Sequence, residues 1–378
     1  MVLSTAVLAA LAFAGGQATL GDRVSKFGEN LFAHIPRSGG PGDLVSPLSV
    51  YQCIGLLVPG SSGSTRSTLL KALQYQPNEE SSFLSDVHDE SVALAKPGSG
   101  LLMANAVWTR PGLALSSSYE TTVTNSFMAS ATALVGLGSA GANQINDWVK
   151  QNTKGRISSL FNSLSASTEI VLTNAVAFDG TWVRPFDERN TKALTFHGSA
   201  GDLDVPTMSR TWGLQYAQTD HGQVAVLPYK EGESMWIGLP KPGDGPTGSM
   251  SDLFSNPTTY YARLDLRLPK FTYTCSYSLN GALEKMGLGE IFSHPDFSRM
   301  MAGGSPGRVS EVIQKTYIKV DEKGTQAAAA TGTVIASAVM RQPAAIPFYV
   351  DHPFAFAIRD DKSGAVLFMG VVRDVKPS

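Results

Sequence analysis

The stretch GTQAAAATGTVIASA, residues 324–338, is the most informative part of this 378-residue chain. It opens with Gly324, continues through Ala327, Ala328, Ala329 and Ala330, and carries no charge or proline. As an exposed loop the segment offers water few polar groups, yet its backbone can pair as a strand. Small side chains can enter a narrow slot between two strands without overpacking it. The composition therefore predicts a loop that is able to become a strand.

The composition of the whole chain is that of a large globular domain. Hydrophobic residues make up 43% of the sequence, which is enough for a sizeable core. Basic and acidic residues number 30 and 32, so the net charge is −2 and does not indicate a nucleic-acid binder. Glycine and proline are spread along the chain and mark no linker. We expect one α+β domain over residues 19–378, monomeric, with no nucleic-acid or membrane partner.

The first 18 residues are apolar and small, like the core of a secretory signal peptide with a cleavage site after Ala14 or Ala18. The run is too short to span a membrane as a helix, and it lacks the usual positively charged start. A signal peptide predicts a secreted, extracellular protein. The alternative is a helix packed on the body, which would leave a cytoplasmic location open. Cys53 and Cys275 are too few for a disulfide framework.

Hydrophobic spacing predicts helices over residues 24–34 and 143–160. Ser46 can cap another helix, which runs to residue 57 with Pro47 in its first turn. Long apolar runs and alternating segments predict the strands. They cover residues 101–108, 169–178, 224–227, 234–239, 262–268, 309–320, 354–358 and 366–372.

Eight short motifs follow one another along the chain. They are INDWV (145–149), TKGRI (153–157), NAVAFDGTWVRPF (174–186), LPY (227–229), LPKF (268–271), MGL (286–288), DHPF (351–354) and LFMG (367–370). In this order and spacing they resemble the serpin family over nearly the whole chain. The resemblance implies the serpin fold, with three β-sheets, about nine helices and an exposed reactive-centre loop at about residues 324–347.

The resemblance also implies a function for the opening stretch. In inhibitory serpins a target serine protease attacks the loop and forms an acyl-enzyme, after which the N-terminal part of the loop inserts into the central sheet. Glu322, Gly324, Thr325 and residues 327–330 match the hinge of that loop. The expected partner is thus a serine protease held in a covalent acyl complex, and the protein is not itself an enzyme.

The residue types in the hinge favour this inhibitory class. Thr325, Ala327 and Ala329 share one face of an extended strand, and all are small and uncharged, so the core can accept them. The alternative is a non-inhibitory serpin that acts as a carrier or chaperone. Gln326 replaces the acidic residue usual in the family, and we expect it to stay exposed after insertion.

The family also has a buried hydrogen-bond cluster, called the shutter, beneath the strands that must open. The matching residues here are Ser46, Ser49, Asn174 and Gln314. Gln314 stands where the family usually has histidine. A glutamine can still bond to serine or asparagine, but it does not titrate. The barrier to opening is therefore expected to differ from that of relatives with histidine.

The bond attacked by the protease is placed by counting. Sixteen residues after Glu322, the family distance, the scissile residue is Ala338, which suits an elastase-like pocket. Counting back from residues 353–354 leaves Val339, Met340 or Arg341 open, and Arg341 would mean trypsin-like targets. Arg341 can also be a solvated loop charge that aids recognition without entering the primary pocket.

Other signals are interpreted as structural. Residues 303–307 match the G-x-S-x-G nucleophile motif, but a strand follows them instead of a helix, so we interpret them as a turn. The six histidines show no metal spacing, and we expect neither a metal nor another cofactor. Residues 85–97 match the heparin-binding region of some serpins but are acidic. Strong heparin activation is therefore not expected.

Overall fold

The computed structural model describes residues 18–37, 39–95, 100–255, 257–303, 307–324 and 344–376. Within these ranges it contains nine α-helices and two short turns of other helix types, η1 (Glu188–Asn190) and η2 (Glu284–Leu288). None of the helices in the described ranges has the length and apolar character needed to cross a membrane. The α-helices are α1 (Leu20–His34), α2 (Pro47–Gly55), α3 (Gly63–Ala72), α4 (Glu80–Leu94), α5 (Ser117–Phe127), α6 (Gly138–Asn152), α7 (Thr247–Ser255), α8 (Asn280–Leu283) and α9 (Glu290–Ser293).

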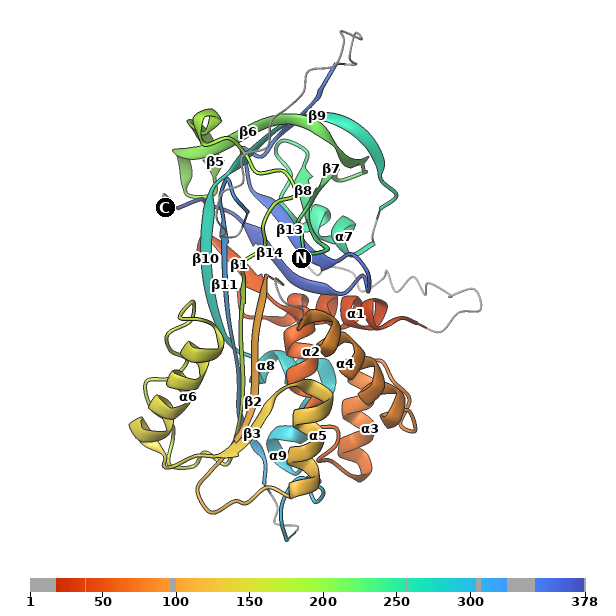
Figure 1. The fold of residues 1–378 in the computed structure, drawn as a ribbon, viewed down its shortest axis with the longest axis vertical. Helices are drawn as coiled ribbons and strands as arrows, with labels where there is room; N and C mark the ends of the chain where they lie inside the picture. The colour runs from red at the N-terminus through yellow and green to blue at the C-terminus, as the bar shows by residue number, and fades with distance from the viewer. Residues whose placement is uncertain are drawn as a thin grey trace, which may run out of the picture.

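A five-stranded sheet runs along the long axis of the molecule (Figure 1). Its order is β10 (Phe271–Ser278), β11 (Val309–Val320), β4 (Ile170–Phe178), β2 (Leu101–Thr109) and β3 (Ser130–Ala133). The strands predicted at residues 101–108, 169–178 and 309–320 are confirmed. Every residue of β4 is buried, as expected for an apolar strand at the centre of a sheet with both faces covered.

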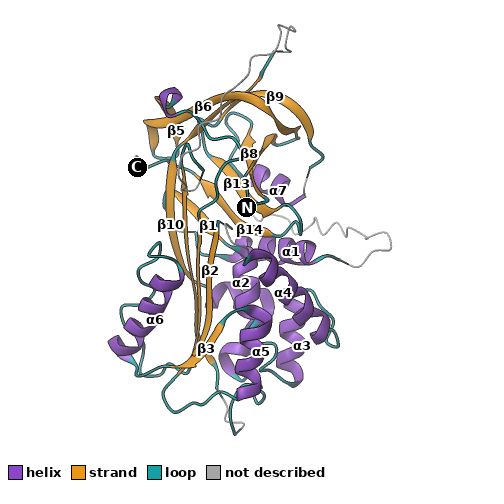
Figure 2. Cartoon of the chain, in the orientation of Figure 1, coloured by secondary structure: helices purple, strands orange, loops and turns teal. Residues whose placement is uncertain are grey.

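The remaining strands form a nine-stranded set that fills the other half of the molecule (Figure 2). Its path is β1 (Gly42–Val45), β14 (Val366–Val372), β13 (Phe354–Asp360), β8 (Glu233–Pro240), β7 (Gly222–Pro228), β6 (Gly201–Gln218), β9 (Tyr260–Pro269) and β12 (Ile346–Tyr349), with β5 (Lys192–Gly198) beside β6. The α+β fold class is confirmed. The expected three sheets appear as two hydrogen-bonded sets because the long strand β6 pairs with β5, β9 and β7 in turn.

The two faces of the five-stranded sheet carry different helices. Figure 1 shows α6 alone on one face, and α2 to α5 on the other. Under α6, Ile145 and Val149 join Trp108 in a small apolar cluster, and Trp148 meets Trp108 edge to face with ring centroids 5.5 Å apart. The opposite face belongs to the main core, which continues into the nine-stranded set. The central strands are therefore covered on both sides.

Helix ends follow local sequence, with one correction. Ser46 caps α2 as predicted, since its side chain accepts from the Ser49 amide and Pro47 lies in the first turn. The helix predicted over residues 143–160 is wrong at its C-terminal end, because α6 stops at Asn152. Lys154 and Gly155 adopt φ values of 49° and 77°, which no α-helix can include. Cys53 and Cys275 are free, and Cys53 is fully buried in α2.

Candidate functional site

The central feature of the candidate site is the seam between β11 and β4. These neighbours run parallel, with a continuous register from Glu311 paired with Val171 to Ile318 paired with Phe178, and with an irregularity between Val309 and Glu311. The two strands are far apart in the sequence, since residues 179–308 lie between the end of β4 and the start of β11. A segment running antiparallel to both could pair with each of them if they separated. The parallel arrangement would therefore allow one more strand to pair between β4 and β11.

Three polar side chains lie side by side on the neighbouring strands β11, β4 and β2. Asn105 on β2 faces Asn174 on β4, and Asn174 faces Gln314 on β11, each as a directly paired residue. Asn174 Nδ2 donates to Asn105 Oδ1, and Gln314 Nε2 donates to Asn174 Oδ1 at 2.6 Å. All three side chains are buried. Opening the seam must break the Gln314–Asn174 bond in a region that water does not reach.

The start of α2 closes this cluster from below the sheet. The Ser46 amide donates to Gln314 Oε1 at 3.2 Å, and Gln314 Nε2 donates to the Ser46 carbonyl at 3.2 Å. Asn174 Nδ2 also donates to Ser49 Oγ. The four residues chosen from sequence, Ser46, Ser49, Asn174 and Gln314, therefore lie together. Sequence reasoning missed Asn105, although it is the sole polar residue within the apolar run 101–108.

Glu322 lies just past the end of β11 and is paired. Lys270 Nζ is 2.9 Å from one carboxylate oxygen, and Thr191 Oγ1 donates to the other at 2.7 Å. Burial by itself would raise the pKa of Glu322, but the hydrogen bonds from Lys270 and Thr191 outweigh it and hold that pKa below its ordinary value. The charged carboxylate thus fixes the point at which the chain leaves the sheet.

Gly324 ends the described part of this segment in a conformation that only glycine adopts easily. Its φ is +129°, and a Cβ built there would lie 2.3 Å from the Gly180 carbonyl oxygen. The residue forms an antiparallel bridge with Thr181, beside β4. Next to it, Trp182 Nε1 donates to the Asp321 carbonyl at 3.0 Å, and its ring stacks on Tyr229. The chain therefore arrives at the top of the seam in contact with both of its sides.

Comparison with known proteins matches this architecture. The family described as Serpin (serine protease inhibitor) matches residues 22–375. The chain belongs to the serpin family. An uncharacterized serpin-like protein of Thermococcus kodakarensis is 33% identical over 88% of this chain and 80% of its own length. Antichymotrypsin-2 of Bombyx mori is 32% identical over 91% of this chain and 95% of its own length.

Solved serpin structures share the fold. Serpin48 of the insect Tenebrio molitor, described as highly specific, superposes with a TM-score of 0.86 at 24% identity, over 94% of this chain and 98% of its own. Thyroxine-binding globulin in complex with thyroxine superposes with a TM-score of 0.80 at 21% identity, over 94% of this chain and 98% of its own. The family is one of protease inhibitors and not of enzymes.

The other residues predicted from sequence for the hinge and the scissile bond lie outside the described residues. They are Thr325, Ala327, Ala328, Ala329, Ala330, Ala338, Val339, Met340 and Arg341. The same holds for residues 1–17 and for the middle of the 303–307 motif. Within the described ranges, no three His, Cys, Asp or Glu side chains are grouped so that they could hold a metal ion. His352 hydrogen-bonds to Asp351 and to the Pro240 carbonyl.

The acidic residues matched to the heparin region are on α4. Glu90 is buried and accepts a hydrogen bond from Ser363, and Asp86 accepts one from Tyr75. Both carboxylates therefore serve the packing of this helix. No lysine or arginine belongs to α4 itself, whose sequence is ESSFLSDVHDESVAL.

Proposed function

We propose that this serpin is a suicide inhibitor of serine proteases that acts by inserting its cleaved loop between β4 and β11. The observation that carries the proposal is the parallel seam, together with the chain that arrives at its top at Gly324. The protease serine would attack the scissile carbonyl and form an ester, while the new amino terminus departs with a proton. The freed N-terminal segment would then enter the seam before the ester is hydrolysed.

The register supports this insertion. Gly324 is already an antiparallel partner of Thr181, so a continuing antiparallel strand would reach the level of Ile170 at about residue 335 (324 + 181 − 170). Ala338 would follow just past the lower end of the seam. The backbone N–H and C=O groups of successive inserted residues would hydrogen-bond alternately to β4 and to β11. A scissile bond after Arg341 would place the acylated residue three positions further on.

We further propose Ala338 as the scissile residue and an elastase-like protease as the target. The alternatives are Val339, Met340 or Arg341, and Arg341 would direct the protein to trypsin-like proteases. The protein is proposed to be a secreted monomer after removal of a signal peptide, with cytoplasmic location as the alternative. Mass measurement of the protein from its native source and its elution volume test these two points.

A non-inhibitory role as a carrier or chaperone is the second candidate. The structural similarity to thyroxine-binding globulin, solved with thyroxine, is the observation in its favour. The uncharged, small residues of the hinge favour inhibition, because a carrier does not need to bury them. The relative named antichymotrypsin supports inhibition as well.

Two measurements separate the candidates. An inhibitor incubated with elastase should give a covalent complex that survives boiling in detergent. A carrier should be cleaved without forming a complex, or should not react with the protease. Limited cleavage near residue 338 should raise the melting temperature strongly, since the cut loop can insert. The uncut protein melted alongside is the control. Equal melting temperatures would overturn the proposed mechanism.

A further inference from the structure

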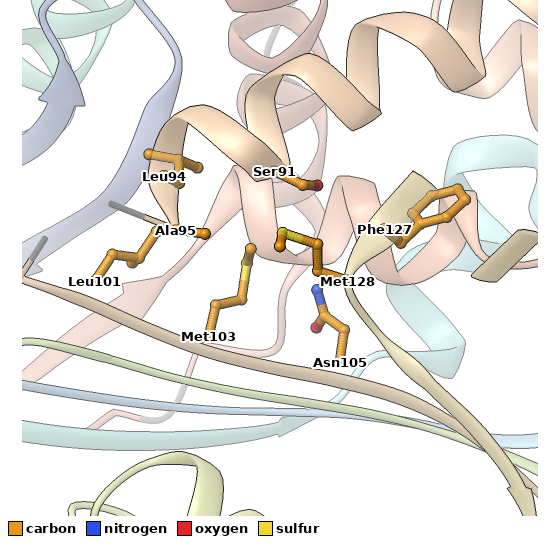
Figure 3. Close-up of a pocket in the computed structure, with 8 residues that line it drawn as sticks. All are labelled: Ser91, Leu94, Ala95, Leu101, Met103, Asn105, Phe127 and Met128. Atoms are coloured by element: carbon orange, nitrogen blue, oxygen red, sulfur yellow. The ribbon is translucent and has the colours of Figure 1, made fainter. Parts of the chain in front are cut away.

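Two cavities in the described part of the protein differ in the charge of their walls. Figure 3 shows one of them, between α4, β2 and the end of α5, and none of its eight lining residues is charged. The second has a volume of about 180 Å³ and lies among β5, β6, β9 and the segment that follows β12. Its lining residues are Leu194, Thr195, Phe196, Thr207, Arg267, Tyr349, Val350 and Asp351. One guanidinium group and one carboxylate thus line the same cavity.

Arg267 supplies the positive charge of this second cavity. Its guanidinium carbon lies 4.0 Å from the centroid of the Tyr349 ring, and the Tyr349 hydroxyl donates to Asp265 Oδ2 at 2.6 Å. Stacking on the ring uses the flat face of the guanidinium and leaves its N–H edge for other partners. Among the described residues, no carboxylate forms a salt bridge with Arg267. The N–H edge can therefore bind the carboxylate of a ligand.

Asp351 supplies the negative charge. Its Oδ1 is hydrogen-bonded to His352 Nδ1 at 2.7 Å, and its side chain is 48% exposed. The Val350 amide donates to the Arg267 carbonyl at 2.9 Å, which ties this segment to β9. The His197 amide donates to the Asp351 carbonyl at 2.7 Å, which ties the same segment to β5. The backbone therefore holds Asp351 in place, and its Oδ2 can accept hydrogen bonds from a ligand.

Much of the remaining wall is apolar. Leu194, Phe196 and Val350 contribute hydrophobic side chains, and the last two are buried. Thr195 is exposed, so the cavity opens to solvent beside it. A cavity of about 150 Å³ is enough to hold benzene. The second cavity can therefore hold a short aliphatic side chain together with the polar groups that carry it.

The two charges decide the class of ligand. A simple anion would be repelled by the Asp351 carboxylate, and a simple cation would be repelled by the Arg267 guanidinium. A molecule that carries both charges avoids both repulsions and can form a charge-assisted hydrogen bond at each end. We propose that this cavity binds a free aliphatic α-amino acid, with its carboxylate on Arg267 and its ammonium group on Asp351. The aliphatic side chain would contact the apolar wall.

The bound amino acid would contact three parts of the fold at once. These are β5, β9 and the segment that leads from β12 to β13. Because the site exists only in the folded protein, the amino acid should raise the melting temperature by an amount that grows with its concentration. This proposal stands apart from the inhibitory function, since no residue of the seam lines the cavity.

Binding is tested on the full chain by calorimetric titration with four probes. L-Valine carries both charges and a side chain, L-valinol lacks the carboxylate, 3-methylbutanoate lacks the ammonium group and glycine lacks the side chain. Since a hydrogen bond to a charged group changes affinity about tenfold or more, L-valine should bind at least about tenfold more tightly than L-valinol and 3-methylbutanoate. Glycine should also bind more weakly, because it leaves the apolar wall uncovered. Equal affinities for the four probes, or no saturable binding of L-valine, would overturn the proposal.

The location of the ligand is tested by nuclear magnetic resonance, with the methyl groups of leucine and valine residues labelled with ¹³C. Leu194 and Val350 line the second cavity, whereas Leu94 and Leu101 line the cavity in Figure 3. Unlabelled L-valine should shift the signals of the first pair saturably and leave those of the second pair in place. Shifts confined to other methyl groups would show that the amino acid binds elsewhere, and the assigned site would be wrong.

Two variants separate the two charges. Arg267→Gln should remove the preference for L-valine over L-valinol but retain the preference over 3-methylbutanoate, and Asp351→Asn should do the reverse. The controls are Arg263→Gln, on β9 but outside the cavity lining, and Asp220→Asn, at an exposed position. Both controls should retain both preferences.

The opposite patterns expected of the two variants cannot arise from a general loss of stability, and the melting temperature of each variant verifies that it is folded. If either variant keeps both preferences or loses both, the assigned contacts are wrong. If a variant does not fold, the four probes and the methyl signals of the unaltered protein still decide whether the site exists.

Discussion

Gln314 Nε2 donates a hydrogen bond to Asn174 Oδ1 at 2.6 Å, directly across the seam between β11 and β4. The two residues are paired in the strand register, so the bond lies in the path of any strand that enters between them. Both side chains are buried, so breaking the bond without a replacement would leave buried polar atoms without a hydrogen-bond partner. Under the proposed function, we expect this contact to contribute to the barrier against opening.

Gln314→Leu should weaken the closed seam. The variant leaves Asn174 Oδ1 and both backbone groups of Ser46 without their partner, at a cost of about 2 kcal/mol of unfolding free energy. Urea unfolding measures this loss, and spontaneous loss of inhibitory activity at 37 °C measures the lower barrier. Gln314→Glu, similar in size, is the comparison variant. A leucine variant as stable as the original would contradict the assigned role.

Glu322→Gln should loosen the exit of β11. The variant keeps the shape but removes the charge that pairs with Lys270, which should lower the unfolding free energy at pH 7 by about 1–2 kcal/mol. Since the pKa of Glu322 is lowered by folding, the pair is fully present above the ordinary carboxyl pKa and is lost as pH falls through the folded value. The difference between the two proteins should therefore shrink in acid.

Denaturant titrations at pH 7 and in acid test this dependence. Glu188→Gln is the matched control, because Glu188 is 70% exposed and lies 3.9 Å from Lys323. A difference that stays constant at every pH would show that the Glu322 charge is not responsible.

Glu233→Gln should stabilise the protein in mild alkali. Burial, then the charges of Glu231, Asp360 and Asp361, raise the pKa of Glu233 to about 7, and its Oε2 has no hydrogen-bond partner in the described structure. The folded state thus holds a proton that the unfolded state releases at about pH 4.3. Stability should therefore fall as pH rises from about 4.3 through 7.

The glutamine variant removes this dependence. It should match the original protein near pH 4 and exceed it by about 1–3 kcal/mol near pH 8. Chemical unfolding at both values measures the gain, and Glu29→Gln, at an exposed position of α1, serves as the control. An equal gain at both pH values would refute a titrating Glu233.

Thr325→Arg should turn the inhibitor into a substrate. By the two-residue period of a strand, residue 325 would face the core after insertion, and burying an unpaired charge costs several kcal/mol. Gln326→Arg is the matched control, since its side chain would point to solvent. Titration of the protease measures the number of inhibitor molecules consumed per protease. It should rise several-fold for the first variant and stay near the original for the second.

Ala338→Arg should redirect the protein toward trypsin. The carboxylate at the base of the trypsin pocket pairs with a guanidinium, so trypsin inhibition should quicken and elastase inhibition slow. Mass spectrometry of the released C-terminal peptide of the original protein decides the position. A peptide that begins at Val339 supports Ala338. One that begins at residue 342 would place the scissile bond after Arg341 and make trypsin-like enzymes the expected targets.

Local features of the fold could be predicted from the sequence because they depend on near neighbours. The strand over residues 309–320 follows from its own apolar alternation, and the start of α2 follows from Ser46 and Pro47. The end of α6 could not be located in this way. The apolar spacing continues past Asn152, while the left-handed turn at Lys154 and Gly155 ends the helix.

Sequence by itself determined the family and four members of the buried cluster, because these follow from the order of the motifs. It also determined the strands on both sides of the seam, because these follow from hydrophobic periodicity. Only the tertiary structure decided which partners these residues meet. Asn105 joined the cluster through register, and Lys270 met Glu322 through strand pairing across 52 positions. The need for glycine at 324 came from the Gly180 carbonyl close beside it. Contacts between distant segments depend on how strands align in space, and no local pattern encodes that alignment.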